Sequence, residues 1–252
     1  MIIDADVHIS PYKKGNRIQI NDLLHLMDKN GVDKALTWLQ PPYLRKVAES
    51  NQYVYKAMKN HPDRILGFGW ADPNLGVDKA REEARKCIEE YGFFGVKLNG
   101  AQNSFRIDDP ELSLPVIEEI AKYGNRLAFH VGGDAIENTH PFRVAKIAER
   151  FPQLDILAVH MGGASDPDLA DAMIEFAGKY DNITLIGSHV SAVKVLKAVN
   201  ELGADRVCYG SDAPFNYMRV ELAKYDALLE EEVTDAEKEK IMGENIADLF
   251  DL

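Results

Sequence analysis

The chain has 252 residues, of which 46% are hydrophobic and 28% are charged, and its formal net charge is −12 at pH 7. This composition is typical of a folded globular protein, and one α/β barrel routinely occupies about 250 residues as a single domain. No apolar stretch reaches the roughly 18 residues of a membrane span, and no Lys/Arg cluster offers a nucleic-acid contact. We therefore expect one domain over residues 1–252 that acts on a small-molecule substrate, without nucleic acid or membrane as a partner.

Short apolar runs alternate with segments of helical periodicity, which is typical of repeated βα units. The predicted strands cover residues 2–8, 34–39, 65–70, 95–98, 127–131, 156–160, 183–187 and 207–211. The predicted helices cover residues 20–30, 78–91, 110–123, 142–150, 167–180, 192–202, 219–230 and 235–250. This order predicts an α/β fold, a single (β/α)8 TIM barrel with a C-terminal helix. A doubly wound sheet uses many of the same patterns, but its dinucleotide-binding form loses support because no G-x-G-x-x-G follows a strand.

Two features bear on the compartment of the protein. The sequence begins with Met-Ile-Ile-Asp-Ala-Asp, without the basic and apolar regions of a signal peptide. The two cysteines, Cys87 and Cys208, are far apart, so neither a disulfide framework nor a cysteine metal site is predicted. We therefore expect a cytoplasmic protein.

The first strand carries polar residues at every second position. Asp4, Asp6 and His8 alternate with apolar residues, so the strand period of two places them on one face. The apolar face suits the outer helices, which leaves the polar face inside the barrel. Burying ionised groups without partners costs several kcal/mol, so a cation or a hydrogen-bond network is expected there. The alternative is a solvated edge strand, which a closed barrel does not have.

Three other strands also end in polar residues. His130 and His160 each close a strand and are followed by two glycines, and Asp212 follows the last strand. A single strand-end His is more often a core residue and a single Asp often caps a turn, but their recurrence at one level of the barrel favours ligands. Imidazole and carboxylate groups without thiolates indicate a catalytic site for zinc, manganese or ferrous iron. The predicted constellation is Asp6, His8, His130 and Asp212 around one divalent ion, with His160 beside it.

Residues next to these strand ends are candidates for the substrate pocket. Trp70 and Asn99 follow the third and fourth strands, and His189 lies two residues beyond Gly187. For each of them, an ordinary loop position is an equally good interpretation.

At these residues the sequence resembles the amidohydrolase superfamily. The branch is the amidohydrolase-related one (family 2), which includes aminocarboxymuconate semialdehyde decarboxylase, resorcylate-type decarboxylases and pyrone dicarboxylate lactonase. The matching motifs are Ile-Asp-Ala-Asp-Val-His at 3–8, Gly-Val-Lys-Leu at 95–98, Phe-Pro at 151–152, His-Met-Gly-Gly at 160–163, Gly-Ser-Asp-Ala-Pro at 210–214 and Gly-Glu-Asn-Ile-Ala at 243–247.

The resemblance implies that His8, His130 and Asp212 bind a divalent metal and that His160 assists catalysis. Asp6 stands where the family pattern Ile-Asp-x-His-x-His has its first His; the resorcylate-type decarboxylases carry Glu there. More distant amidohydrolases bridge two metals with a carboxylated lysine on the fourth strand. In this branch the lysine is usually not a bridge, so Lys97 is expected to face an anionic substrate or to make a structural ion pair. Dimers are common among these proteins, although the sequence does not specify an oligomeric state.

The first hypothesis for function is metal-dependent hydrolysis of a small amide, lactone or related ester. A metal-activated water would attack, with zinc as the first expected ion and manganese or iron as alternatives. Asp212 would carry the proton and His160 would bind the developing oxyanion or orient the water.

The alternative is non-oxidative decarboxylation of a small, possibly aromatic, carboxylic acid at the same metal site. Asp212 or His160 would then protonate the carbon that loses carbon dioxide. Asp6 favours this reading and the short chain disfavours it. A third hypothesis, a barrel that only binds its ligand, is disfavoured because the four residues His8, His130, His160 and Asp212 are all present.

Overall fold

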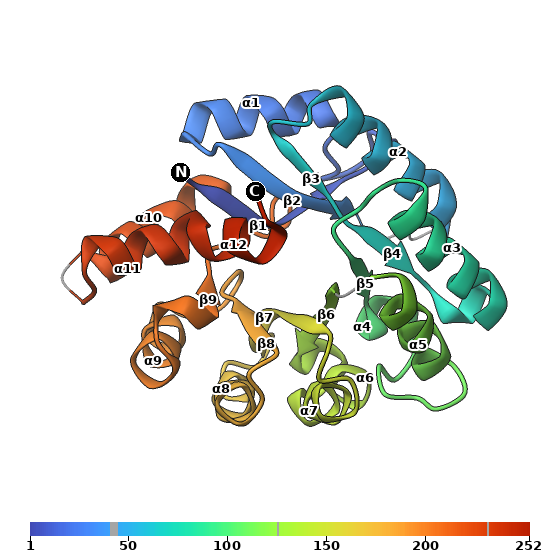
Figure 1. The fold of residues 1–252 in the computed structure, drawn as a ribbon. Coiled ribbons are helices and arrows are strands. Elements are labelled where there is room, and N and C mark those ends of the chain that lie inside the picture. Colours follow the sequence, from blue (N-terminus) through green and yellow to red (C-terminus); the bar gives the residue numbers. More distant parts are fainter. Residues whose placement is uncertain (41–44, 125, 231) are drawn as a thin grey trace.

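The computed structural model describes residues 1–40, 45–124, 126–230 and 232–252. Parallel strands surround a central axis and helices cover the outside (Figure 1). The strands are β1 (Ile3–Ile9), β2 (Lys34–Leu39), β3 (Ile65–Gly67), β4 (Gly69–Ala71), β5 (Val96–Leu98), β6 (Arg126–Gly132), β7 (Asp155–Ala164), β8 (Ile183–Ile186) and β9 (Val207–Cys208).

The α-helices are α1 (Ile20–Asn30), α2 (Val47–Asn60), α3 (Val77–Glu89), α4 (Gly100–Asn103), α5 (Ser113–Tyr123), α6 (Ile136–Thr139), α7 (Pro141–Arg150), α8 (Leu169–Lys179), α9 (Ala192–Leu202), α10 (Met218–Leu229), α11 (Asp235–Glu239) and α12 (Asn245–Phe250). Four short turns of other helix types complete the structure: η1 (Pro73–Leu75), η2 (Gly133–Ala135), η3 (Ala204–Arg206) and η4 (Lys240–Glu244).

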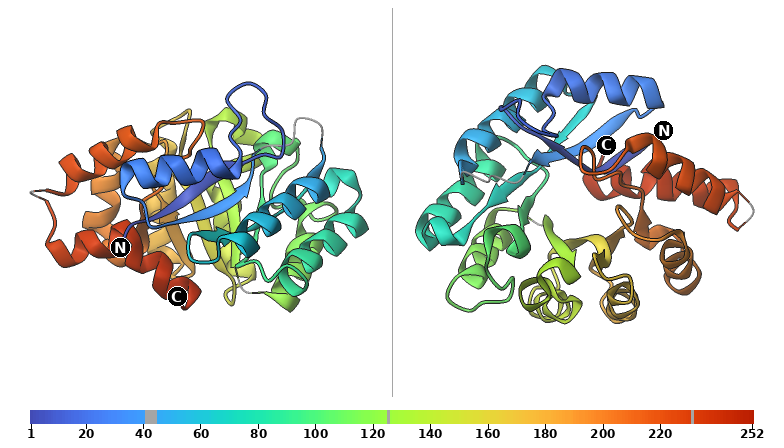
Figure 2. Two further views of the ribbon diagram at one scale, coloured as in Figure 1. Left: turned by 90° about the horizontal axis from the view of Figure 1, so that it is seen from above. Right: turned by 180° about the vertical axis from the view of Figure 1, so that it is seen from behind.

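The strands form two sheets, ordered β1-β2-β3 and β4-β5-β6-β7-β8-β9, with parallel pairing throughout. The sheets join at Phe68, between β3 and β4. There the Phe68 amide donates to the Thr37 carbonyl, and the Gly69 amide donates to the Gly95 carbonyl. They join again between the first and last strands, where Val7 bridges to Ala213 and the His8 amide donates to the Ala213 carbonyl at 2.8 Å. The views in Figure 2 show the closed ring that results. The predicted TIM barrel is confirmed.

Three of the differences between the described structure and the predicted elements are informative. The strand predicted over 65–70 is two short strands, each paired with a different neighbour. The helix predicted over 235–250 is continuous but changes type: its middle segment, Lys240–Glu244, is π-helical and contains Gly243, where an added Cβ would lie 2.4 Å from the Met1 carbonyl oxygen. Helix α2 was not predicted at all. Its buried face includes the polar residues Ser50 and Asn51, which obscure the apolar period, and its N-cap Lys46 makes no side-chain cap.

Both faces of the central strands are buried, as is typical of a parallel sheet covered by helices. Every residue of β1 is buried, including Asp4, Asp6 and His8. Ionisable groups in such a strand need partners, and these are supplied by the other strand ends. None of the helices described is both long enough and apolar enough to cross a bilayer.

Gly187, which follows β8, is fixed by close packing. A Cβ at this position would lie 2.0 Å from the hydroxyl oxygen of Tyr225 on α10. We expect Gly187→Ala to lower the free energy of unfolding by about 1–3 kcal/mol, measured by urea denaturation, because the core must shift to admit the methyl group. Tyr225→Phe in the same chain should restore most of this loss.

Gly178→Ala on α8 is the matched control for Gly187→Ala. Its Cβ would meet only Leu202 Cδ2, at 3.4 Å, and alanine favours a helix. Equal losses in the two variants would contradict the packing argument.

Candidate metal centre

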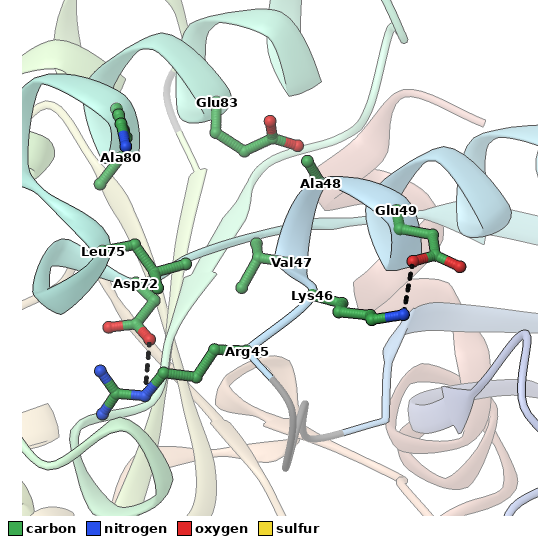
Figure 3. Close-up of a pocket in the computed structure, with 10 residues that line it drawn as sticks. Arg45, Lys46, Val47, Ala48, Glu49, Asp72, Leu75, Ala80 and Glu83 are labelled. Carbon is green, nitrogen blue, oxygen red and sulfur yellow. Dashed lines mark ion pairs between the residues drawn. The ribbon is translucent and has the colours of Figure 1, made fainter.

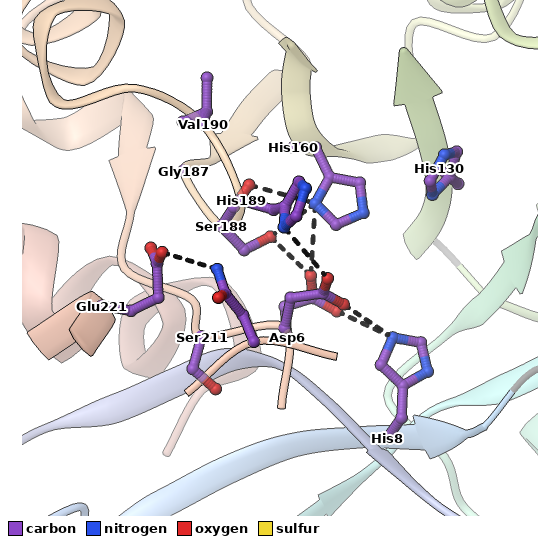
Figure 4. A network of polar contacts seen from close by, with 12 residues as sticks. Asp6, His8, His130, His160, Gly187, Ser188, His189, Val190, Ser211 and Glu221 are labelled. Atoms are coloured by element: carbon purple, nitrogen blue, oxygen red, sulfur yellow. Dashed lines mark hydrogen bonds and ion pairs between the residues drawn. The ribbon is translucent and has the colours of Figure 1, made fainter. Parts of the chain in front are cut away.

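Asp6, His8 and Asp212 come together where the first strand meets the end of the last. Figure 4 shows Asp6 and His8 facing each other in this group. The Nε2 atom of His8 lies 3.4 Å from Asp6 Oδ1 and 3.4 Å from Asp212 Oδ1. Two ligand atoms at about 2.1 Å from one tetrahedral ion are about 3.4 Å apart. The three side chains are therefore spaced as ligands of one ion.

Hydrogen bonds fix the orientation of the His8 ring. Nδ1 lies 2.9 Å from the Leu39 carbonyl oxygen, to which it donates, so Nε2 is the ring nitrogen next to the carboxylates. Trp38 Nε1 donates to the unprotonated Nε2 at 3.1 Å. Burial alone lowers the pKa of His8, but the carboxylates of Asp212 and Asp6 outweigh it and raise the pKa above its ordinary value.

Asp6 is the most enclosed carboxylate of the site. Its Oδ2 accepts a 2.5 Å hydrogen bond from Ser188 Oγ, and its Oδ1 lies 3.8 Å from Lys97 Nζ without a hydrogen-bond donor of its own. Burial raises the pKa of Asp6, yet the charge of Lys97 and the nearby histidines lower it well below its usual range. An ionised carboxylate with an unsatisfied buried oxygen fits a cation.

His160 is held against the same carboxylate from the other side. Its Nδ1 lies 3.1 Å from the Ser188 carbonyl oxygen, 3.0 Å from Ser188 Oγ and 3.7 Å from Asp6 Oδ2. Burial lowers the pKa of His160 to about 4, and the opposing effect of the Asp212 and Asp6 carboxylates offsets only part of this shift. The imidazole is therefore neutral at pH 7, and with Nδ1 engaged its Nε2 remains for a ligand.

One group of side chains in the described part of the chain is arranged to hold an ion. The ligand atoms of Asp6, His160 and Asp212 all lie within 4.8 Å of one another. This arrangement, with His8 next to it, supports a single divalent-metal site.

His130 is held by a neighbouring carboxylate. Its Nε2 lies 2.8 and 3.0 Å from the two carboxylate oxygens of Asp134, and its ring centroid lies 4.8 Å from that of His160. The Asp134 carboxylate accepts this bond in the turn η2, directly after β6. That His130 is a metal ligand remains a prediction.

The site opens into a cavity of about 170 Å³. Its described lining residues are His8, Asn99, Gln102, His130, Asp134, His160, Ala164, Ser165, His189, Asp212 and Phe215. The predicted pocket residues Asn99 and His189 are among them, and His189 Nδ1 lies 3.9 Å from Asp212 Oδ2.

The two other predicted pocket residues, Trp70 and Lys97, are not part of that lining. Trp70 is fully buried and donates from Nε1 to Asn103 Oδ1 at 2.9 Å. Lys97 is 1% exposed, its Nζ lies 3.6 Å from the centroid of the Trp38 ring, and burial lowers its pKa to about 8. Its contact with Asp6 makes it a structural ion pair beneath the pocket, one of the two roles expected for it.

A larger pocket of about 320 Å³ lies between α2 and α3 (Figure 3). Four of its six charged lining residues form two ion pairs: Arg45 Nε lies 3.8 Å from Asp72 Oδ2, and Lys46 Nζ lies 3.5 Å from Glu49 Oε2. No histidine is among its described lining residues. Its size alone does not make it the reactive site, which requires the histidine and carboxylate groups of the smaller cavity.

Three residues that shape the site were not predicted from the sequence. Trp38 is an apolar strand residue, and only the fold brings its Nε1 to His8. Ser188 follows β8 as His189 does, so its position at a strand end could have identified it as a site residue. Asp134 lies four residues after His130 and could also have been predicted, because an acidic residue next to a strand-end histidine is a frequent partner of that histidine.

Asp4, predicted to point into the barrel with Asp6, makes different contacts. The pairing of β1 with β2 shifts between Asp4 and Val7, and Asp4 Oδ1 accepts hydrogen bonds from the Ser211 amide at 2.8 Å and the Asp6 amide at 3.2 Å. Its Oδ2 has no hydrogen-bond partner among the described residues. Burial raises the pKa of Asp4 from 3.8 to about 7.

This raised pKa predicts a pH-dependent stability of the metal-free protein. Between pH 4 and 7 the folded chain keeps a proton on Asp4 that the unfolded chain releases. Asp4 therefore lowers the free energy of unfolding progressively as pH rises through this range, by about 4 kcal/mol at most. Asp4→Asn should remove this dependence. We expect urea denaturation to show the variant gaining stability relative to wild type from pH 5 to pH 8, whereas the exposed Asp63→Asn should follow wild type. A constant difference across this range would contradict the assignment.

The family model described as Amidohydrolase matches residues 3–252. The chain therefore belongs to the amidohydrolase family, as the sequence motifs indicated.

Curated relatives of the chain are decarboxylases. A 2-amino-3-carboxymuconate-6-semialdehyde decarboxylase of Dictyostelium discoideum is 26% identical over 254 residues, covering 85% of this chain and 69% of the relative. A gamma-resorcylate decarboxylase of Rhodococcus jostii (strain RHA1) is 23% identical over 296 residues, covering 93% of this chain and 88% of the relative.

Solved structures share the fold. A 2,6-dihydroxybenzoate decarboxylase with bound 2,6-dihydroxybenzoate has a TM-score of 0.79 at 21% identity, covering 99% of this chain and 98% of that one. A dihydroxybenzoic acid decarboxylase of Polaromonas sp. JS666, with bound manganese and 2-nitroresorcinol, has a TM-score of 0.75 at 18% identity and covers 100% and 97%. A 5-carboxyvanillate decarboxylase of Sphingomonas paucimobilis has a TM-score of 0.78 at 18% identity and covers 100% and 99%.

These comparisons correct the first functional hypothesis. The hydrolase prediction is wrong, because the relatives and structural neighbours are decarboxylases of carboxylic acids. The sequence could not make this distinction, since the same Asp and His ligands can hold an ion that activates water or an ion that binds a substrate carboxylate.

Proposed function

We propose that the protein is a metal-dependent, non-oxidative decarboxylase of a small aromatic carboxylic acid. The observation that carries the proposal is the match to gamma-resorcylate decarboxylase over 93% of this chain, together with a carboxylate and histidine site at the inner end of a small cavity. A cavity of about 170 Å³ is smaller than the roughly 300 Å³ at which pockets for drug-sized ligands begin, and it suits a single-ring acid.

A divalent ion bound there supplies a Lewis acid for the substrate carboxylate and for a neighbouring hydroxyl group. Asp6, His8 and Asp212 would hold it, and the ion would offset the two carboxylate charges that meet at His8. The Polaromonas decarboxylase that shares the fold contains manganese, and a site with two carboxylates suits manganese, so we propose manganese rather than the zinc expected first.

Asp212 is the acid in this proposal. It lines the cavity, and its Oδ2 faces His189, which is half exposed and can return a proton from solvent. Asp212 gives a proton to the ring carbon that bears the carboxylate; the carbon–carbon bond then breaks, carbon dioxide leaves, and the bonding electron pair returns to the ring. His160, neutral and fixed at Nδ1 by Ser188, orients the substrate through Nε2.

Product analysis tests this proposal. The manganese-loaded protein should release carbon dioxide from hydroxybenzoic acids such as 2,6-dihydroxybenzoate, and dialysis against a chelator should stop the release until manganese returns. A panel of lactones and amides is the control. Acid release from that panel, without carbon dioxide release from any aromatic acid, would contradict the proposal.

A further inference from the structure

The cavity above the metal centre has an unusual balance of charge. Among its described lining residues are four histidines, His8, His130, His160 and His189, and two carboxylates, Asp134 and Asp212, but no lysine or arginine. Lys97 is the nearest buried cation, and it is committed to Asp6 and the Trp38 ring below the cavity. The described lining therefore offers no permanently charged cationic side chain to receive an anionic group of a ligand.

Asp134 contributes negative charge away from the ion-binding group. Its two oxygens lie 2.8 and 3.0 Å from His130 Nε2, its side chain is 35% exposed, and it lines the cavity, so a ligand in the cavity can reach the carboxylate. Because the cavity is only about 170 Å³, a ring that fills it lies close to both Asp134 and the Asp212 side.

The formal charges around the cavity can be counted. With all three carboxylates ionised, as before Asp212 takes up the proton that it transfers, Asp6, Asp134 and Asp212 give −3 and Lys97 gives +1, so one divalent ion brings the sum to zero. One substrate carboxylate can bind the ion directly. A second carboxylate on the same ring would meet Asp134 with no lysine or arginine of the described lining to offset it, and like charges placed together in a binding site oppose binding.

We infer that Asp134 makes this site selective for aromatic acids with a single carboxylate, whose other ring substituents are neutral hydrogen-bond donors such as hydroxyl or amino groups. Its carboxylate accepts from such a donor and repels a second anion. The inference rests on the proposed function, since it assumes that the substrate carboxylate occupies the metal centre. A preference for a single carboxylate would distinguish this chain from decarboxylases of ring diacids, such as the structurally similar 5-carboxyvanillate decarboxylase.

Three probes of similar shape isolate the effect of charge. They are 2-hydroxybenzoate, 2-hydroxy-3-nitrobenzoate and 2-hydroxyisophthalate, and the last two differ mainly in that an uncharged nitro group replaces the second carboxylate. Calorimetric titration into the manganese-loaded protein gives a dissociation constant for each without requiring turnover. We expect wild type to bind the nitro compound about tenfold more tightly than the diacid, which corresponds to about 1.4 kcal/mol.

Two variants test whether Asp134 causes that preference. Asp134→Asn keeps an oxygen that can accept from His130 but removes the charge, and it should reduce the tenfold ratio to about twofold or less. Glu137→Gln removes an exposed acidic charge three residues further along, outside the described cavity lining, and should leave the ratio unchanged. Manganese content is measured in both variants, so that a change in ligand preference is not confused with loss of the ion.

The outcomes separate the two proposals. Equal binding of the nitro compound and the diacid by wild type, or an unchanged ratio in Asp134→Asn, would overturn the role of Asp134 even if carbon dioxide is released. A tenfold ratio that Asp134→Asn removes, in a protein that releases no carbon dioxide from any monoacid, would support this selectivity and contradict the decarboxylase. Failure of all three acids to bind the loaded protein would overturn both.

Discussion

Asp212→Asn should reduce the rate of carbon dioxide release from a hydroxybenzoic acid by about 10³-fold. The substitution keeps the shape of the side chain but removes both the transferable proton and one of the two carboxylates that face His8 Nε2 at 3.4 Å. Single-turnover assays at saturating manganese separate the loss of proton transfer from weaker metal binding. The expected result is a large fall in kcat that added manganese does not recover.

Asp235→Asn is the control for this variant, because Asp235 is exposed in the first turn of α11. It should retain wild-type kcat. An Asp212→Asn protein that keeps more than about a tenth of the wild-type rate at saturating manganese would contradict the assignment of Asp212 as the acid.

His8→Ala should weaken manganese binding more than about 100-fold, because removing even a residue that only supports a metal ligand costs 10–100-fold. The variant loses the nitrogen that lies between Asp6 and Asp212, and it leaves two ionised carboxylates without the imidazole. Equilibrium dialysis followed by elemental analysis gives the affinity directly, and activity should fall with it.

His25→Ala provides the comparison, since His25 is an exposed histidine on α1. It should bind one manganese per chain with wild-type affinity. Retention of more than half of the metal by His8→Ala under conditions that saturate wild type would remove His8 from the ligand set.

The barrel was predictable because its elements follow local patterns. Helices α1 and α9 have the predicted bounds, since each combines an apolar face with a glycine immediately after its last turn. Helix α2 was missed because its buried Ser50 and Asn51 serve contacts across the fold: Asn51 exchanges hydrogen bonds with the backbone of Trp70. That role depends on a residue 19 positions away and leaves no periodic pattern.

The site was predictable to the level of strand ends but not of individual contacts. Asp6, His8, His160 and Asp212 meet because parallel strands bring their carboxyl ends to one rim of the barrel. The irregular register of β1 at Asp4, the bond between His130 and Asp134 and the enclosure of Lys97 by Trp38 depend on side-chain packing, which residue spacing does not specify.

The junction between the first and last strands has a further consequence for folding. Asp6 and Asp212 stand on opposite sides of this junction, and the Asp212 amide donates to the Asp6 carbonyl at 2.9 Å. An ion held by both carboxylates links residues more than 200 positions apart in the sequence, so it binds the closed barrel and not the open chain. Metal at 100 times its dissociation constant would then raise the free energy of unfolding by about 2.7 kcal/mol. The cation would therefore stabilise the closed barrel in addition to its role in the reaction.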